Sequence, residues 1–343
     1  MAIAPDAHEV ACAFRLPDPK GWLVPVRHGS SETWRLDTFD GRYFVKRLAV
    51  DGRSDQLEKA MAFEVRASAA GVPAPAPVEP VHPAWGLAAD LGDGLGVLRV
   101  HPWLDGEPPT AEVDLSRWYG ATLARLHSVQ PAADQPTDAM WPLWYGVNSA
   151  EAWDGWLAAG LAQERPWAAV LKERLPLIAD LTACVEAAYQ EVGDYVVTHR
   201  DLLPHNVLLA GGRGPVLIDW DTAGPDSATL EAAAAAFDGA RLDTGHAGQA
   251  GHSGHAVEPD PARIAATLAA YRDNGGDLRP CDFLLARRLG VHLARCAERI
   301  RVTLGTEPAG SLDPAAADAR AAQQLTGLPE FASLLFRWSQ RME

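Results

Sequence analysis

The chain has 343 residues, of which 48% are hydrophobic and 22% charged. This composition provides for a packed core and argues against wholesale disorder. The formal net charge of -15 would repel a phosphate backbone, so nucleic acid is a poor partner. The same charge would favour a cationic ligand, but a purely solubilising role is the favoured explanation.

Cysteine usage and the hydrophobic pattern point to a reduced, cytoplasmic environment. The four cysteines form no C-x-x-C pair, which disfavours a disulfide framework or a zinc site. The first residues lack the basic start and apolar stretch of a secretory signal peptide. No run of 18 apolar residues is present, so no membrane span is expected. The cysteines are Cys12, Cys184, Cys281 and Cys296.

Strand patterns dominate the first hundred residues. Asp40-Gly41 lies between two apolar runs and is a strong signal for a two-residue hairpin. Residues 53–70 carry apolar side chains at helical spacing and are followed by Gly71, which predicts one helix. The predicted strands are residues 22–26, 33–36, 43–48, 85–89 and 97–100.

Helical patterns dominate after residues 102–109, interrupted by a β-rich segment at 195–218. The predicted helices are residues 115–129, 153–161, 166–190, 260–274 and 283–304, with an Ala-rich helix near Thr229. The sequence therefore predicts a bilobal α+β fold. Its predicted parts are a small β-rich N-terminal lobe over 1–100, a hinge at 101–106 and a larger helical C-terminal lobe over 107–343.

A segment rich in Gly and His spans residues 239–256 and contains His246, His252 and His255. Histidines are good metal ligands, but no helical spacing or carboxylate partner supports a metal site here. A solvated flexible loop is the favoured interpretation.

The most informative segment runs from Val196 to Gly224 and places polar residues between apolar strands. Asp201 and Asn206 are separated by a loop that Pro204 is expected to keep non-helical, and Asp219 directly follows an apolar run. Phosphoryl transfer needs a carboxylate to accept the proton of the attacking hydroxyl and oxygen ligands to hold Mg²⁺. Asn206 and Asp219 offer such oxygens, which leaves Asp201 free as a base.

The motif His199-Arg200-Asp201 with Asn206, followed by Ile218-Asp219-Trp220-Asp221, resembles the pattern of the aminoglycoside phosphotransferase family. That family shares the protein-kinase-like fold, and its pattern is H-x-D-x-x-x-x-N with a later D-x-D. The resemblance implies that Asp201 is the catalytic base and that Asn206 and Asp219 bind Mg²⁺. It also implies that His199 braces the catalytic loop rather than reacting.

The same resemblance assigns nucleotide contacts to the N-terminal lobe. Lys46, in the second strand of the hairpin, resembles the lysine that contacts the α- and β-phosphates. A carboxylate of the following helix is expected to pair with it, and Glu64 is preferred although Glu58 is also available. The phosphate-loop position is occupied by Gly29, Ser30 and Ser31, for which an ordinary hairpin turn is an equal interpretation.

The stretch from Leu98 to Gly106 falls where the family hinge pairs backbone groups with adenine. Val100, His101 and Trp103 are the expected contacts, and side chains there do not distinguish ATP from GTP. The helix at 115–129 also resembles a family helix, in which His127 is expected to be structural.

The acceptor is expected to be a small molecule, because no A-P-E-like segment for docking a protein follows Asp219. Asp221, Asp226 and Glu231 lie just beyond the metal residues and would suit an amine-bearing acceptor. Solvated helix ends or helix capping explain these carboxylates as well. Most tryptophans between residues 141 and 167 are predicted to be core residues, with Trp153 as a candidate to line the acceptor pocket.

The sequence thus predicts a Mg²⁺-dependent kinase that transfers the γ-phosphate of ATP, or of GTP, to a hydroxyl of a small molecule. An aminoglycoside or similar antibiotic is the leading acceptor. A metabolic kinase for a choline-, homoserine- or amino-sugar-like compound is the alternative, since catalytic motifs do not define the acceptor pocket. A pseudokinase serving as a binding module is a third possibility, disfavoured because every reactive residue is present.

Overall fold

The computed structural model describes residues 4–28, 31–48, 54–92, 95–131, 144–241, 258–307 and 313–342. The chain folds as two compact units: one is formed by residues 1–109 with 197–224, the other by 110–196 with 225–343. This division differs from the predicted boundaries at 100 and 106, because a later segment joins the N-terminal part. Backbone hydrogen bonds from Leu217 N to Pro73 O and from Leu209 N to Glu107 O, both 2.8 Å, attach it there.

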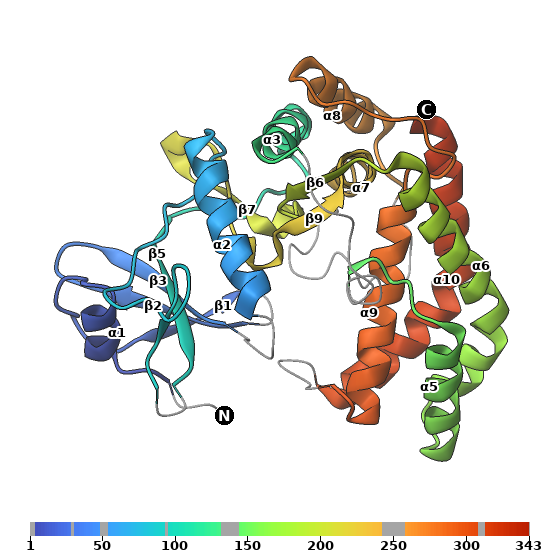
Figure 1. Ribbon diagram of the computed structural model, residues 1–343, viewed down its shortest axis with the longest axis horizontal. Helices are drawn as coiled ribbons and strands as arrows, with labels where there is room; N and C mark the ends of the chain where they lie inside the picture. Colours follow the sequence, from blue (N-terminus) through green and yellow to red (C-terminus); the bar gives the residue numbers. More distant parts are fainter. Residues whose placement is uncertain are drawn as a thin grey trace. The chain divides into compact units, whose positions relative to one another are not determined.

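The first unit contains an antiparallel sheet of five strands in the order β1-β2-β3-β5-β4 (Figure 1). Each predicted strand has a counterpart, and β4 is shorter than expected because residues 85–88 form a tight turn closed by a Trp85–Ala88 bridge. The strands are β1 (Val24–His28), β2 (Ser31–Asp37), β3 (Arg42–Arg47), β4 (Ala89–Asp90) and β5 (Val97–Pro102). In the β3–β5 pair, Lys46 lies directly opposite Arg99.

Two helices accompany this sheet. Helix α2 (Ser54–Ala69) matches the predicted helix and buries Leu57, Met61, Phe63 and Glu64. Helix α1 (Ala7–Ala13) was not predicted; Asp6 caps its N-terminus, and its apolar residues join the sheet residues Trp34, Leu36 and Val45 in one hydrophobic core.

The segment 197–224 consists of short elements joined by tight turns. Strands β7 (Val207–Leu209) and β8 (Pro215–Leu217) form an antiparallel hairpin, and β6 (Tyr195–Thr198) pairs with β9 (Gly224–Ser227). Single-turn 3₁₀ helices lie at η1 (Pro204–Asn206), η2 (Gly211–Arg213) and η3 (Trp220–Thr222). The β-rich prediction for residues 195–218 is therefore confirmed.

The second unit is helical and encloses the largest hydrophobic core. Its helices are α3 (Ser116–Val129), α5 (Ala150–Ala162), α6 (Ala168–Val192), α7 (Ala228–Gly239), α8 (Pro261–Asp273), α9 (Ala286–Leu304) and α10 (Pro314–Met342). Helix α10 was not predicted, because its Ala-rich first half lacks a clear apolar period. Helices α3 and α8 approach closely at Gly120, where an added Cβ would lie 2.2 Å from the Thr267 carbonyl oxygen.

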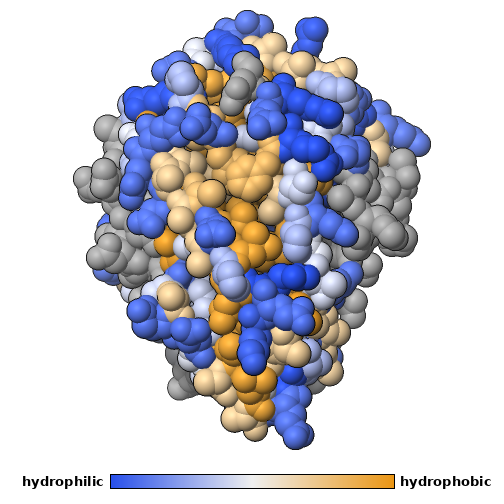
Figure 2. Space-filling model, turned by 90° about the vertical axis from the view of Figure 1, so that its right-hand side faces the viewer, coloured by the Kyte–Doolittle hydropathy of each residue, from blue (hydrophilic) through white to orange (hydrophobic). Residues whose placement is uncertain are grey.

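One face of the helical unit carries an apolar band between hydrophilic side chains (Figure 2). Residues of α5 and α6, among them Trp153, Ile178 and Glu186, line a groove of about 270 Å³ in this unit. Within the described ranges, no helix combines the length and apolarity needed to cross a bilayer. Of the Gly- and His-rich segment 239–256, all but residues 239–241 lies outside the described residues.

Candidate functional site

The loop after β6 holds Asp201 in a defined position. The side-chain amide of Asn206 donates from Nδ2 to the backbone oxygen of Asp201 at 2.9 Å and to its Oδ2 at 2.7 Å. Pro204 occupies the first position of η1, so the loop is a 3₁₀ turn rather than the non-helical loop predicted. The Asp201 side chain keeps 26% of its surface exposed, and His205 Nε2 lies 3.8 Å from its carboxylate. This is a partly accessible carboxylate held by its neighbours.

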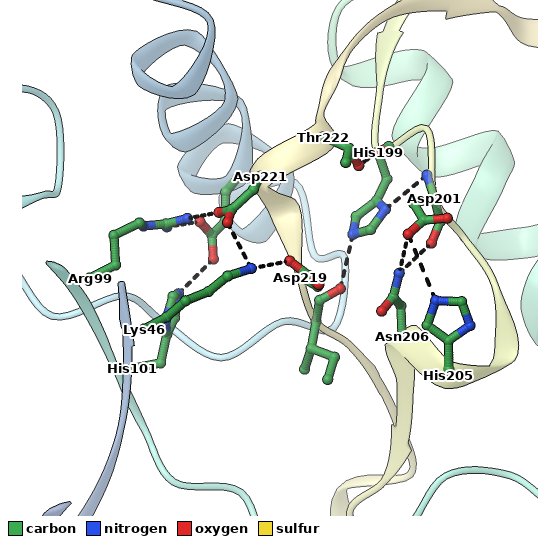
Figure 3. A network of polar contacts seen from close by, with 12 residues as sticks. Lys46, Arg99, His101, His199, Asp201, His205, Asn206, Asp219, Asp221 and Thr222 are labelled. Carbon is green, nitrogen blue, oxygen red and sulfur yellow. Dashed lines mark hydrogen bonds and ion pairs between the residues drawn. The ribbon is translucent and has the colours of Figure 1, made fainter. Parts of the chain in front are cut away.

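His199 joins the two halves of the site (Figure 3). Its Nε2 donates to the Ile218 carbonyl at 3.0 Å, while its Nδ1 accepts from the Asp201 backbone N–H at 3.3 Å. The two bonds together fix a neutral imidazole in one tautomer. The ring is fully buried and packs edge-on against Trp220, with centroids 4.8 Å apart. These contacts tie the loop that carries Asp201 to the residue that follows β8.

We expect His199→Ala to destabilise the protein by about 2 kcal/mol, because two partly buried backbone groups lose their partner. Turnover should fall with it, since Asp201 loses a backbone anchor, while nucleotide affinity should change little. Urea denaturation and nucleotide binding measure these effects, with the exposed His8→Ala as control. A variant of wild-type stability would show that His199 is not a brace.

Two residues of the site have left-handed backbone conformations that only Gly adopts readily. Arg200 has φ of 64° and Asp219 has φ of 65°. The buried Arg200 guanidinium donates from Nε to the Thr222 carbonyl at 2.5 Å, and Thr222 Oγ1 donates to the His199 carbonyl at 3.0 Å. Such strain persists only where surrounding contacts over-determine the backbone, and it often marks functional sites.

Lys46 on β3 points toward the D-x-D motif (Figure 3). Its ammonium lies 2.5 Å from Asp219 Oδ1 and 2.7 Å from Asp221 Oδ2. Burial by itself lowers the pKa of Lys46, but the charges of Asp221 and Asp219 outweigh burial and raise the pKa above its ordinary value. Lys46 is therefore held as a buried cation.

Glu64 has other partners than the one predicted. It is fully buried, its Oε2 accepts from Arg99 Nη2, and its Oε1 lies 3.0 Å from His101 Nε2. The predicted Lys46–Glu64 ion pair is therefore wrong for this structure, because Arg99 and His101 already use both carboxylate oxygens. Burial by itself raises the pKa of Glu64, but Arg99 and His101 together lower it below its usual value.

Asp221 lies inside this charge cluster, and its predicted contact with an acceptor remains a prediction. It contacts Lys46 through Oδ2, and its Oδ1 accepts from Arg99 Nη1 at 3.1 Å. Burial by itself raises the pKa of Asp221, but Lys46 and Arg99 outweigh it and lower the pKa to about 2. Arg99 was missed by sequence analysis, although an arginine between Leu98 and Val100 in an apolar strand is an unusual feature.

The lowered pKa of Glu64 predicts acid sensitivity. Because the folded-state pKa lies below the unfolded value of about 4.3, its stabilisation is complete above that pH and is lost as pH falls below it. Glu64→Gln should lower stability at pH 7 by about 3 kcal/mol, since the buried Arg99 loses a charged partner. It should also flatten the loss of stability below pH 4.

Urea midpoints measured from pH 7 to pH 3 test this expectation. The exposed Glu9→Gln in α1 serves as the matched control. An unchanged pH profile in Glu64→Gln would contradict the assigned pair.

Asn206 and Asp219 suit a hard divalent cation. The Asn206 amide nitrogen is committed to Asp201, which leaves Oδ1 as its ligand atom, and Ile218 N donates to the Asn206 carbonyl at 2.9 Å. That bond holds Asn206 beside the strand end that carries Asp219. Among the described residues, no group of three or more His, Cys, Asp or Glu side chains is placed so that it could hold a metal ion. One amide and one carboxylate match Mg²⁺, which takes few protein ligands and retains water.

The structure restricts the predicted nucleobase contacts. The Val100 carbonyl accepts from Val78 N at 2.9 Å, and Trp103 N donates to the Arg42 carbonyl at 2.8 Å. Val100 and His101 belong to β5, and the His101 side chain is directed to Glu64. The Val100 carbonyl and the Trp103 N–H are thus already hydrogen-bonded within the protein. Contacts between residues 98–106 and a nucleobase remain a prediction.

In the predicted phosphate loop, only Ser31 is described, as the first residue of β2. Gly29 and Ser30 lie outside the described residues.

Two of the predicted acceptor residues are internal to the helical unit. Asp226 is 2% exposed and receives hydrogen bonds from Arg287 Nε at 2.7 Å and from Tyr189 Oη at 3.0 Å. Glu231 is 1% exposed and lies 2.9 Å from His127 Nε2. Both carboxylates are buried and already paired, so their surroundings do not support contact with an acceptor, which remains a prediction.

Trp153 is also buried. It is 3% exposed, and its ring packs edge-on against Trp156 with centroids 4.9 Å apart. Trp167 is fully buried as well, which agrees with the predicted core role of most tryptophans. Trp141 lies outside the described residues. Trp153 also lines the groove between α5 and α6, and its contact with an acceptor remains a prediction.

A five-stranded antiparallel sheet with a buried lysine, a carboxylate–amide loop and a D-x-D motif at the turn after the β7–β8 hairpin are together typical of a kinase-like phosphotransferase. Residues 22–284 match the model of the phosphotransferase enzyme family APH. The chain therefore belongs to this family. A comparison of the sequence with curated proteins gave no match.

Solved structures of similar fold include kinases with different acceptors. An amicoumacin kinase in complex with AMP-PNP, Ca²⁺ and Ami has a TM-score of 0.61 at 13% identity, over 94% of this chain and 92% of that one. A spectinomycin phosphotransferase in complex with ADP and spectinomycin has a TM-score of 0.58 at 12% identity, over 93% and 95%. An ethanolamine kinase of Plasmodium vivax has a TM-score of 0.53 at 14% identity, over 91% and 83%. The likeness establishes the kinase-like α+β fold.

Proposed function

We propose that the protein transfers the γ-phosphoryl group of ATP to a hydroxyl group of a small molecule, in a Mg²⁺-dependent reaction. The observation that carries the proposal is the carboxylate of Asp201, fixed by Asn206 and left partly accessible. A cytoplasmic location, where nucleotide and Mg²⁺ are available, is part of the proposal, and GTP is the alternative donor.

In the proposed reaction, the acceptor oxygen attacks the γ-phosphorus while its proton passes to the Asp201 carboxylate. The new P–O bond forms as the bond between the γ-phosphorus and the β–γ bridging oxygen breaks, and the nucleoside diphosphate leaves. Lys46 holds the phosphates by charge, and His199 keeps the backbone of Asp201 in place. Bound by Asn206 and Asp219, Mg²⁺ would supply charge neutralisation on the phosphate oxygens.

An antibiotic is the leading acceptor class. Similar structures include kinases bound to spectinomycin and to amicoumacin, which supports a hydroxylated drug. The formal net charge of -15 favours an acceptor that carries an amine. The likeness to an ethanolamine kinase supports a small amino alcohol as the second candidate.

An acceptor screen with ATP and GTP, followed by product mass, tests the proposal. The screen should contain aminoglycosides, spectinomycin, a macrolide, ethanolamine, choline and homoserine. We expect a mass gain of one phosphoryl group, about 80 Da, on one class only, with no product in the presence of a chelator. Expression in a sensitive bacterial host separates the two candidates, because only an antibiotic kinase confers resistance. Nucleotide binding without transfer to any acceptor would instead favour a binding module.

A further inference from the structure

Lys46 and Arg99 form a cross-strand pair of like charges. They lie directly opposite one another on β3 and β5, so both side chains project from the same face of the sheet. Lys46 is 7% exposed and Arg99 is 2% exposed. Like charges in such a pair repel one another, and burial removes the solvent screening that would weaken the repulsion. Carboxylates must therefore compensate both cations.

The nearby carboxylates do not compensate the two cations equally. Glu64 is committed to Arg99 and His101 and has no bond to Lys46. Asp221 lies between the two cations, with Oδ1 bonded to Arg99 and Oδ2 to Lys46 (Figure 3). Asp221 is thus the bridge that holds the pair together.

The remaining partner of Lys46 has a competing role. Asp219 Oδ1 accepts from Lys46, yet in the proposed reaction the same carboxylate binds Mg²⁺. A divalent cation on Asp219 would offset the charge that attracts the ammonium. A lysine held by Asp219 alone would then lose its anchor when the nucleotide complex binds.

Contacts within the protein hold Asp221 in position. Asp221 belongs to η3, in which Trp220 packs against Phe63 of α2, with centroids 6.2 Å apart, and against His199. Its bond to Arg99 fixes the carboxylate from the opposite side. Such support gives a side chain the fixed geometry that a positioning role needs.

We propose that Asp221, rather than a carboxylate of helix α2, is the residue that positions Lys46 for the nucleotide phosphates. This inference rests on the proposed function, because it assumes a nucleotide beside Lys46. Glu64 acts on Lys46 only indirectly, because it holds Arg99, which in turn bonds to Asp221.

A double-mutant cycle on nucleotide affinity tests the assignment without any acceptor. The dissociation constants of Mg²⁺·AMP-PNP and Mg²⁺·ADP are measured by calorimetry for the full chain and for Asp221→Asn, Glu64→Gln and Lys46→Met. The double variants Asp221→Asn/Lys46→Met and Glu64→Gln/Lys46→Met complete the two cycles. We expect Asp221→Asn to weaken binding about tenfold in the wild-type background. In the Lys46→Met background its effect should be less than about twofold.

The Glu64 cycle is the matched control. Glu64→Gln should have the same effect in both backgrounds, because Glu64 does not contact Lys46. Coupling of Glu64 with Lys46 that equals or exceeds that of Asp221 would overturn the proposal. If Asp221→Asn does not fold, Asp221→Glu serves in the same cycle, since it keeps a charge beside Arg99 but displaces the carboxylate from Lys46.

The Mg²⁺ dependence of nucleotide binding distinguishes a residue that positions Lys46 from a residue that binds the metal ion. The Mg²⁺ concentration for half-maximal nucleotide binding should be within about twofold of wild type in Asp221→Asn and raised in Asp219→Asn. An equal rise in both variants would assign Asp221 to the metal and overturn the proposal. If the wild type binds no nucleotide, the proposed function itself fails. If the wild type binds nucleotide normally but the effects of Asp221→Asn and Lys46→Met are independent of one another, this inference fails while the proposed function stands.

Discussion

Asp201→Asn should reduce turnover about 10³-fold and leave nucleotide binding within about twofold of wild type. The carboxylate is the proposed proton acceptor, and an amide cannot take up the proton of the attacking hydroxyl. Asparagine keeps the size of the side chain and an oxygen that still accepts from Asn206 Nδ2, so the loop should keep its shape. The loss would therefore report the missing base rather than a damaged fold.

Single-turnover product formation and calorimetric nucleotide binding measure the two parts of this expectation. Asp40→Asn provides the matched control, because Asp40 is exposed in the hairpin between β2 and β3. It should behave as wild type in both measurements. Near-normal turnover in Asp201→Asn would show that another group removes the proton.

Asp219→Asn should lower kcat/KM about 10³-fold and raise the Mg²⁺ concentration needed for half-maximal activity at least about tenfold. The substitution removes the charged ligand of the proposed metal site and one of the two carboxylates at Lys46. Asparagine is the appropriate replacement, because residue 219 has φ of 65° and asparagine tolerates the left-handed region better than alanine does.

Activity measured over a Mg²⁺ titration tests this expectation, and excess Mg²⁺ should restore part of the loss. Thermal unfolding of the same samples separates metal binding from stability, with Asp40→Asn as the reference. If the Mg²⁺ dependence of Asp219→Asn matches that of wild type, Asp219 does not bind the metal.

Local sequence was sufficient to predict the loop that carries Asp201 and the β2–β3 hairpin. Asp201, Asn206 and Asp219 are joined by short connections, η1 and the β7–β8 hairpin, so their spacing largely determines which side chains can meet. Helix α2 was found by its period for the same reason, because helical spacing is a local property. Helix α10 was missed because an Ala-rich segment has no apolar face until its packing partner is known.

By itself, the sequence determined the family and the fold class, because the motifs that indicate them depend on short-range spacing. Only the tertiary structure decided how the charges pair. The register of β3 against β5 places Arg99 opposite Lys46. As a result, Glu64 pairs with Arg99, whereas Asp221 pairs with both Arg99 and Lys46. Strand register is set by side-chain burial across the whole sheet, so no single segment specifies it.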